Sequence, residues 1–297
     1  MVSTLMASTS VLIYNPAAGG RRSAAHPRRI REILAAGGRT VDLAPTAAPG
    51  DATDLARAAA QSGCDAVYVL GGDGTLREAA AGLMGGETAL GALPGGTINV
   101  VAASLGLPSR PAAAATRLRE ATVREMDVGL CDDQPFLILT SVGLDGRIMA
   151  RVPPRLKRHL GRLAVGLEGA RDWWSYDYPE VKVVADGREL HGTFAAACNL
   201  SRYGGSTRLA PRARPDSGRL ELIVFRGRGR RATLAFAADL LLGRHTQRSD
   251  VVALAVDEVR FLGPATLPLE IDGDGMALAP PHEIRLSAKR LRVLSPI

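Results

Sequence analysis

The sequence predicts an α/β protein, in which an N-terminal doubly wound parallel sheet with helices is followed by a second domain of antiparallel strands. Up to about residue 124, short apolar runs alternate with stretches of helical period, which is typical of a parallel sheet covered on both faces. From residue 179 onward, short apolar runs separated by polar turns predominate, as in antiparallel sheets. The 297 residues are enough for two such domains.

The most informative stretch is the apolar run 67–70, which ends in the turn 71–75, Gly-Gly-Asp-Gly-Thr. Glycines at the end of a buried strand let the backbone approach a ligand, and the free amides of a following helix favour an anion. We therefore predict a phosphate-binding turn in which Asp73 holds a metal ion or orders the amides. A plain strand-to-helix turn with Asp73 as the helix cap is the alternative.

The other elements of the first domain follow the same alternation. Strands are expected at 11–15, 40–43, 67–70 and 89–93. Helices are expected at 26–36, 51–61, 76–84 and 112–121, and a further helix opens with residues 94–99 and runs to 105. Asp51 is the expected cap of the helix 51–61. Glycine-containing turns also follow the strands 11–15 and 89–93. All three turns then lie at the carboxyl edge of the sheet, where such folds bind ligands, and this agreement favours nucleotide binding.

The second domain is expected to begin near residue 124. Extended segments are predicted at 124–130, 135–142, 181–184, 190–198, 220–225, 251–261, 267–271 and 284–286. A polar turn at 269–275 carries Asp272 and Asp274. A carboxylate beside a nucleotide can accept the proton of an acceptor hydroxyl, as a phosphotransferase needs, but Asp-Gly-Asp-Gly is also a good hairpin connection.

Two segments, 155–174 and 230–242, have the pattern of basic amphipathic helices. Such a helix can lie on an anionic membrane, with Trp174 suited to the interface. The alternative is an apolar stripe that faces the core while the charged side is solvated.

The composition limits the classes of binding partner but does not identify one. The formal net charge of +7 rests almost wholly on arginine, so a basic surface could meet nucleic acid, anionic lipid or a phosphorylated ligand. The aromatic content of 4% includes no interleaving of basic and aromatic residues, which disfavours nucleic acid. No apolar run reaches the length of a bilayer span and no signal peptide is predicted, so we expect a cytoplasmic protein whose three cysteines are reduced.

Several motifs together resemble a known family. They are Asn15-Pro16 with Gly19-Gly20, the turn 71–75 followed by Glu78, Leu93 to Asn99, Gly143 to Gly146, Gly204-Gly205 before Leu209 to Pro211, Asp216 to Gly218, and Asp272 to Asp274. Their order and spacing resemble the diacylglycerol kinase catalytic domain family, which includes sphingosine and ceramide kinases and bacterial lipid kinases.

The resemblance implies ATP in a cleft between an α/β domain and a β-sandwich, Mg²⁺, and transfer of the γ-phosphoryl group to a lipid hydroxyl. It implies domains of 1–124, completed by a last strand in 289–297, and 125–288. Positions that match nucleotide contacts are Asn15, Thr46, Gly71, Gly72, Asp73, Gly74, Thr75 and Thr97.

The resemblance also implies catalytic and metal-binding roles. Asp274 stands where the family carries its proton acceptor, usually glutamate, and Asp272 is the second candidate. Many bacterial relatives hold a structural Mg²⁺ with two consecutive acids in the loop before Leu220; here Ser217 replaces the second, which leaves Asp216.

The sequence thus favours a lipid kinase that visits the anionic inner face of a membrane, binds ATP and Mg²⁺ but no nucleic acid, and is a candidate homodimer. No lysine follows a glycine turn, so amides, helix N-termini, Mg²⁺ and arginines such as Arg21 or Arg77 must meet the phosphate charge. The alternatives are an NAD kinase-like enzyme, which shares the turn 71–75, and a nucleotide- or lipid-binding module that has lost catalysis.

Overall fold

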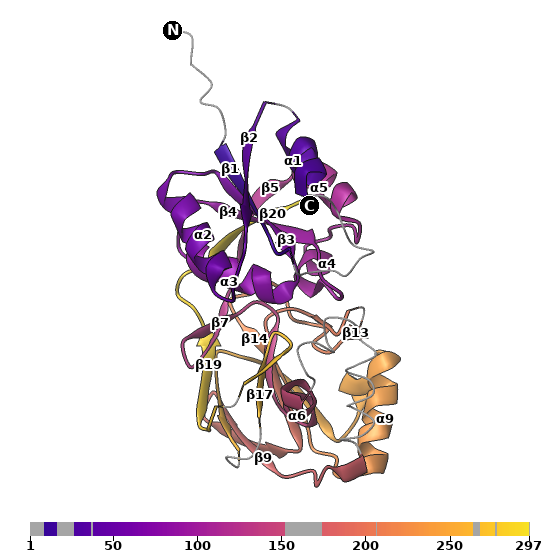
Figure 1. The fold of residues 1–297 in the computed structure, drawn as a ribbon. Coiled ribbons are helices and arrows are strands. Elements are labelled where there is room, and N and C mark those ends of the chain that lie inside the picture. Colours follow the sequence, from indigo (N-terminus) through magenta and orange to yellow (C-terminus); the bar gives the residue numbers. More distant parts are fainter. Residues whose placement is uncertain are drawn as a thin grey trace. The chain divides into compact units, whose positions relative to one another are not determined.

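The computed structural model describes residues 9–16, 27–36, 38–151, 174–205, 207–263, 268–276 and 278–296 (Figure 1). The chain divides into two compact units: unit 1, Met1–Met126 with Lys289–Ile297, and unit 2, Asp127–Ala288. Most of the helix expected at 155–174 lies outside the described residues. No helix in the described part of the chain is long and apolar enough to cross a membrane.

Unit 1 is built on one six-stranded sheet, which confirms the predicted parallel α/β architecture. Its strands follow the order β2-β1-β3-β4-β20-β5, and only β5 runs antiparallel to its neighbour. The strands are β1 Thr9–Tyr14, β2 Thr40–Pro45, β3 Ala66–Gly71, β4 Ala89–Pro94, β5 Thr122–Met126 and β20 Leu291–Ser295. The C-terminal strand therefore lies inside the sheet formed by the N-terminal part of the chain.

Helices cover both faces of this sheet. They are α1 Pro27–Ala35, α2 Asp51–Gln61, α3 Asp73–Leu83, α4 Val100–Ser104 and α5 Pro111–Leu118. In Figure 1, α2 and α3 pack together on one face, whereas α1 packs with α5 on the other. Because they are covered from both sides, β3 and β4 are buried along their whole length, which explains their unbroken apolar sequences.

Two helix starts differ from the sequence expectation. Helix α3 begins at Asp73, inside the glycine turn, rather than at residue 76. The N-cap of α2 is Gly50, not Asp51: the Asp51 carboxylate instead accepts the amides of Ala47, at 2.7 Å, and Ala48, at 2.9 Å. These bonds lower the pKa of Asp51, and they fix the loop that leads from β2 into the helix.

Unit 2 is a sandwich of two six-stranded antiparallel sheets, as predicted. One sheet has the order β10-β9-β16-β19-β6-β7 and the other β15-β14-β11-β8-β17-β18. Their bounds are β6 Gly129–Cys131, β7 Gln134–Phe136, β8 Leu139–Gly143, β9 Val181–Ala185, β10 Arg188–Gly192, β11 Phe194–Cys198, β14 Leu220–Phe225, β15 Val251–Val256, β16 Glu258–Leu262, β17 Leu269–Ile271, β18 Asp274–Met276 and β19 His282–Leu286. Alternate side chains of both sheets, such as Val183, Phe261, Leu222 and Val224, form one core between them.

The smaller elements of unit 2 lie between these strands. They are α6 Leu144–Arg151, the short pair β12 Arg202–Tyr203 and β13 Thr207–Arg208, α9 Arg230–Leu241, and the 3₁₀ turn His245–Gln247. Helix α9 falls where the sequence predicts a helix. Its buried Phe236 stacks on Phe225 of β14, with ring centroids 4.5 Å apart.

Four predicted extended segments each cover parts of two strands that belong to different sheets. In unit 2, the segment 135–142 divides into the end of β7 and most of β8, 190–198 into the end of β10 and β11, and 251–261 into β15 and most of β16; the segment 124–130 divides between β5 of unit 1 and β6 of unit 2. At the corner between β15 and β16, Asp186 Oδ1 accepts the amides of Asp257 and Glu258, at 3.1 and 3.0 Å. Because the strands on either side of a corner bury side chains in the same core, the apolar pattern continues across it and hides the break.

The β17–β18 hairpin is anchored to unit 2 by its own turn. Asp272 and Gly273 both have positive φ, 49° and 88°, as the favoured two-residue hairpin turn requires. The buried Asp272 carboxylate accepts the amides of Leu137 at 2.7 Å, Ile138 at 2.8 Å and Leu139 at 3.1 Å. One side chain thereby satisfies three backbone donors of the neighbouring segment.

Replacing this anchor should destabilise unit 2. We expect Asp272→Ala to lower the free energy of unfolding by about 3 kcal/mol or more, because it leaves three buried donors without their acceptor and puts alanine at positive φ. Asp272→Asn, which tolerates that conformation and keeps one acceptor oxygen, should lose less. Urea unfolding followed by circular dichroism measures both, and a loss below about 0.5 kcal/mol for the alanine variant would contradict the anchoring role.

Candidate active site

The predicted nucleotide residues of unit 1 gather at the carboxyl edge of its sheet. Asn15 and Thr46 follow the adjacent strands β1 and β2, and the turns 71–75 and 95–99 follow β3 and β4. The Asn15 amide donates to Leu70 O at 3.3 Å, and the Thr46 amide donates to Tyr14 O at 3.0 Å. Backbone contacts thus join the start of each connection to the neighbouring strand. Arg21, which the sequence analysis offered as a phosphate partner, lies outside the described residues.

The turns after β3 and β4 touch backbone to backbone. The Gly95 amide donates to Gly71 O at 2.9 Å. A Cβ atom on Gly95 would lie 2.8 Å from Gly71 N, and one on Gly96 would lie 2.6 Å from the Gly72 Cα. These glycines are therefore required by the approach of the two turns to each other, in addition to any approach of a ligand.

Asp73 holds the same two turns together through its side chain. Its Oδ2 accepts the amide of Val100 and its Oδ1 that of Val101, both at 3.0 Å. Asp73 is thus bound at the start of α4, whereas its own helix α3 has Gly72 as N-cap without a side-chain bond. Neighbouring Asn99 is held at φ 55° by bonds from Gly96 N to its Oδ1, 2.7 Å, and from its Nδ2 to Gly96 O, 2.8 Å.

The first turn of α3 keeps amides available for an anion. Helix α3 has 11 residues, and neither the Gly74 nor the Thr75 amide donates a hydrogen bond to any residue that the structure describes. Such donors attract phosphate, helped by the helix dipole. The first amides of α4 are already bonded to Asp73, so α4 does not offer the same site. Thr97, in the turn before α4, is exposed.

A Mg²⁺ ion fits these residues only together with phosphate oxygens. Among the described residues, Asp73 and Asp216 belong to no cluster of three potential ligands; the one such group found is Cys131, Asp132 and His282. Mg²⁺ is commonly held by one or two carboxylates plus substrate phosphates, and a carboxylate oxygen that accepts one amide retains a lone pair. Asp73 is therefore compatible with an ion that a nucleotide brings.

The loop around Asp216 is closed without a metal ion. Asp216 is exposed, and Ser217 Oγ donates to Arg214 O at 3.1 Å and to Arg219 O at 2.8 Å. The Gly218 amide donates to Asp127 Oδ2 at 2.7 Å. These bonds fix the loop that carries Asp216, whose metal-binding role stays a prediction.

In unit 2, the two candidate proton acceptors have different surroundings. Asp272 is buried and spends both oxygens on the three amides described above. Asp274 is the half-buried first residue of β18, paired with Ile271 across the hairpin. Of the two, Asp274 is therefore the candidate that a substrate hydroxyl can approach.

Behind this hairpin lies a cluster that the sequence analysis missed. Ser141 Oγ lies 2.8 Å from Asp145 Oδ2 and 3.0 Å from Glu270 Oε2, so it bridges two carboxyl groups. Tyr203 donates its hydroxyl to Asp145 Oδ1, and the Gly273 amide donates to Glu270 Oε1. The cluster connects α6 to the turn that precedes Asp274.

Burial raises the pKa values of the titratable groups in this cluster. Desolvation raises the pKa of Glu270 well above its usual range, and the charge of Asp145 raises it further. Desolvation likewise raises the pKa of Asp145, against hydrogen bonds from Tyr203 and Ser141. The pKa of Tyr203 is raised by desolvation and by the neighbouring carboxylate charges, so the phenol stays a donor. The two bridged carboxyl groups are thus expected to keep a proton to higher pH than free carboxyl groups do.

The sequence alone gives little indication that Ser141, Asp145 and Glu270 form a cluster. Asp145 belongs to the motif 143–146 and Glu270 to the strand before Asp272, but their meeting depends on the pairing of Ser141 with Glu270 across β8 and β17. That register joins residues far apart in the chain. A single sequence does not specify it.

Next to this cluster, unit 2 contains a cavity of about 180 Å³ with a mainly apolar lining. Its walls include Leu144 and Ile148 of α6, Phe194 of β11, and Phe236 and Leu240 of α9. Asp145 and Tyr203 supply polar groups to the same lining. The cavity thus adjoins the hydrogen-bonded cluster that leads to the Asp274 hairpin.

The contact between the glycine turns can be tested with a matched pair of substitutions. We expect Gly96→Ala to lower the free energy of unfolding by about 1–3 kcal/mol, because its methyl group would press on backbone atoms of Gly72. At Gly72 the nearest atom to an added Cβ is 3.7 Å away, so Gly72→Ala should change stability by less than about 0.5 kcal/mol. Urea unfolding measures both; equal losses would contradict the proposed contact.

The carboxyl cluster predicts a pH dependence of stability. A raised pKa means that the folded state keeps protons that the unfolded chain releases. The contribution of these protons to the stability of the folded state is therefore complete below the ordinary carboxyl pKa. It is lost as pH rises through the raised pKa of the folded state. The free energy of unfolding should therefore fall as pH rises above the ordinary carboxyl range, by at most about 1.4 kcal/mol per pH unit for each proton.

Glu270→Gln should flatten this decline, because glutamine is neutral throughout and can still accept the Gly273 amide. Urea unfolding across the same pH range measures the slope, with exposed Glu258→Gln as the control. Identical slopes for the wild type and Glu270→Gln would show that the cluster carries no extra proton.

Comparison with known proteins gives the family. Residues 9–131 match the model of the diacylglycerol kinase catalytic domain, and residues 139–295 match that of the YegS C-terminal NAD kinase beta sandwich-like domain. A Chromohalobacter salexigens protein named "Probable lipid kinase YegS-like" is 36% identical over 231 residues, 76% of this chain and 74% of that protein. The Bacillus subtilis protein named diacylglycerol kinase is 27% identical over 280 residues, 93% and 92% of the two chains.

Solved structures agree on the fold. Two structures from Bacillus anthracis, the second described as a diacylglycerol kinase, have TM-scores of 0.81 and 0.74 at 24% and 23% identity, and each comparison covers 97% of both chains. The family models together span the α/β unit with its glycine turns and the β-sandwich with its acidic hairpin. The chain therefore belongs to the lipid kinase family that joins a diacylglycerol kinase catalytic domain to a YegS-type β-sandwich domain.

Proposed function

We propose that this protein is a Mg²⁺-dependent kinase that transfers the γ-phosphoryl group of ATP to the hydroxyl of a diacylglycerol-like lipid. One observation carries the proposal: in unit 2 an apolar cavity adjoins a hydrogen-bonded cluster, Asp145, Ser141 and Glu270, that leads to the hairpin of Asp274. Apolar walls suit an acyl chain, and the polar lining suits the part of the lipid that bears the hydroxyl.

The acceptor side also distinguishes a lipid from a second nucleotide. An NAD kinase-like enzyme would need polar groups for another nucleotide, whereas this cavity is lined mostly by Leu, Ile and Phe side chains. The volume of about 180 Å³ fits part of an acyl chain rather than a dinucleotide. The family includes proteins named as lipid kinases, which supports a lipid rather than a second nucleotide as the acceptor.

The nucleotide side of the proposal rests on the turn 71–75 in unit 1. The amides of Gly74 and Thr75 would receive phosphate oxygens, and Asp73, fixed by Val100 and Val101, would hold the Mg²⁺ that accompanies them. A divalent ion is needed because neither Gly74 nor Thr75 brings a positive charge. The ion would neutralise charge on the transferred phosphoryl group.

The transfer would need one proton acceptor. As the acceptor oxygen forms its bond to the γ-phosphorus, the bond from that phosphorus to the β-phosphate oxygen breaks, and ADP leaves. Asp274 would take the proton of the acceptor hydroxyl. Asp272 would keep the hairpin that carries Asp274 in place, rather than act as the base.

A peripheral contact with an anionic membrane surface belongs to this proposal, because a diacylglycerol-like substrate resides in a bilayer. A cytoplasmic location and a homodimer stay predictions from the sequence. A module that has lost catalysis would bind nucleotide or lipid without turnover. The following experiment separates a lipid kinase from an NAD kinase-like enzyme and from a module that has lost catalysis.

The function is tested by incubating the full-length protein with γ-labelled ATP and a panel of acceptors, with and without Mg²⁺. The panel contains diacylglycerol, a sphingoid base, phosphatidylglycerol and NAD. Label is expected in a lipid and only with Mg²⁺. Label in NAD alone would overturn the lipid as substrate, and no label in any acceptor, with nucleotide binding retained, would indicate a module that has lost catalysis.

The base is tested by Asp274→Asn, which should lower kcat by about 100-fold or more, because asparagine takes no proton. Its free energy of unfolding should stay within about 0.5 kcal/mol of the wild type, since the residue is half-buried. Exposed Asp177→Asn is the matched control and should keep full activity. An active Asp274→Asn enzyme would exclude this residue as the base.

A further inference from the structure

In the part of the chain that the structure describes, the exposed large apolar side chains are concentrated at one helix. Among the described residues, five large hydrophobic side chains are exposed. Three lie at the end or on the outer side of α9, Leu234 at 61%, Leu241 at 77% and Leu242 at 66% exposure, and Trp174 at 64% contacts Arg230 at its start. Single exposed apolar residues are ordinary, but a cluster of this kind marks a surface that binds something.

Helix α9 is apolar on two sides. Leu234, Leu241 and Leu242 are seven and eight positions apart, so they share one face. Phe236 and Leu240 belong to the opposite side and line the 180 Å³ cavity. A helix that is covered on one face and apolar on the other lacks a partner for its second face.

Four exposed arginines lie within or next to α9 in the sequence. Arg226, Arg228, Arg231 and Arg244 are all exposed, and none forms an ion pair with a described residue. The two nearby acids in sequence, Asp239 and Asp250, are both bound by Arg248, at 2.6 and 2.7 Å. These four arginines therefore bring positive charge that no described acid pairs with, which favours an anionic partner.

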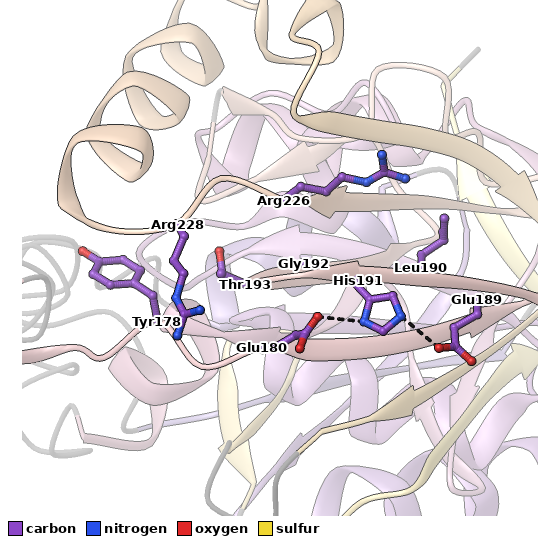
Figure 2. A pocket seen from close by; sticks show the side chains of 9 residues that line it. All are labelled: Tyr178, Glu180, Glu189, Leu190, His191, Gly192, Thr193, Arg226 and Arg228. Carbon is purple, nitrogen blue, oxygen red and sulfur yellow. Dashed lines mark hydrogen bonds and ion pairs between the residues drawn. The ribbon is translucent and has the colours of Figure 1, made fainter.

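A pocket next to the start of α9 contains charges of both signs. The pocket, of about 500 Å³, is lined by Arg226 and Arg228 together with Tyr178, Glu180, Glu189 and His191 (Figure 2). Figure 2 shows His191 between the two glutamates, at 2.7 Å from Glu180 and 2.9 Å from Glu189. Glu189 also pairs with Lys182 at 2.7 Å. The carboxylates of the pocket are thus engaged, whereas its arginines are open to an added anion.

We propose that this surface, defined as Leu234, Leu241, Leu242 and Trp174 with the rim Arg226, Arg228, Arg231 and Arg244, docks unit 2 onto an anionic phospholipid bilayer. The leucines and Trp174 enter the boundary between headgroups and acyl chains, and the arginines contact lipid phosphates. Arg226 and Arg228, at the edge of the 500 Å³ pocket, then contact headgroup phosphates. This inference deepens the proposed function by naming the surface through which the lipid substrate is reached.

A bilayer explains the observations better than a second copy of the chain. A self-complementary dimer through this face would bring the arginine rims of two copies together, and like charges at an interface are unfavourable. An anionic bilayer offers negative phosphates to the rim and an apolar layer to the leucines at the same time. Because α9 also forms a wall of the apolar cavity, docking would hold that wall at the level where acyl chains begin.

The test is flotation of the full-length protein with vesicles of phosphatidylcholine alone or mixed with phosphatidylglycerol. Binding is expected to the mixed vesicles and to weaken with salt. Leu241→Gln with Leu242→Gln should lower the partition coefficient by about tenfold for each leucine. Arg228→Gln with Arg231→Gln should lower it by about fivefold for each arginine, on anionic vesicles only.

Matched controls lie in unit 1. Val123→Gln removes the remaining exposed large hydrophobic side chain, and Arg119→Gln removes an exposed arginine without an ion pair to a described residue; both should bind as the wild type does. Unchanged binding by the leucine variant overturns the proposal. The proposal is also overturned if the leucine variant changes from dimer to monomer in size-exclusion chromatography but still binds vesicles, because the surface would then be a subunit contact.

Activity on a dispersed short-chain diacylglycerol separates this inference from the proposed function. The leucine variant should phosphorylate that lipid as fast as the wild type, yet lose activity on diacylglycerol in vesicles. If the wild type binds vesicles through this surface but phosphorylates no lipid, the proposed function fails and docking stands. If the wild type phosphorylates the dispersed lipid but does not bind anionic vesicles, the function stands and docking is wrong.

Discussion

The approach of two backbone turns to each other is the constraint on which unit 1 depends. The turns after β3 and β4 lie so close that a side chain on Gly95 or Gly96 would collide with the backbone of Gly71 or Gly72. The carboxylate of Asp73 spans the same junction and binds the first amides of α4. This contact fixes where the start of α3 points, and hence where its unbonded amides are presented. The glycines of these turns are thus explained partly by protein packing.

Unit 2 uses the same device at a different place. Asp272 binds three amides and thereby holds the hairpin that presents Asp274, just as Asp186 binds two amides at the corner between β15 and β16. A carboxylate that accepts backbone amides is stabilised in its charged form, and Asp272, which accepts three and is buried, is less available to a substrate than Asp274. Neighbouring aspartates in one motif can therefore have opposite roles, one as an anchor and the next as a reactive group.

The order of the strands and helices could be predicted from the sequence because buried strands and amphipathic helices have distinct periods. Helix 51–61 has the predicted bounds, and α9 differs by one residue. What the sequence hides are contacts between distant segments. The corners within 190–198 and 251–261 escape detection because both sides face one core. The cluster of Ser141, Asp145 and Glu270 depends on a strand register that only the folded chain provides.

The position of β20 has a consequence for how the protein is made. Residues 291–295 lie between β4 and β5, so the α/β unit is interrupted by the whole β-sandwich and completed by the last strand of the chain. During synthesis, the N-terminal segment emerges from the ribosome first but has an open edge at β4 until residues 291–295 have been made. The sandwich, by contrast, is a continuous insertion and can close earlier. Completion of the α/β unit therefore waits for a strand that follows the whole sandwich in the sequence.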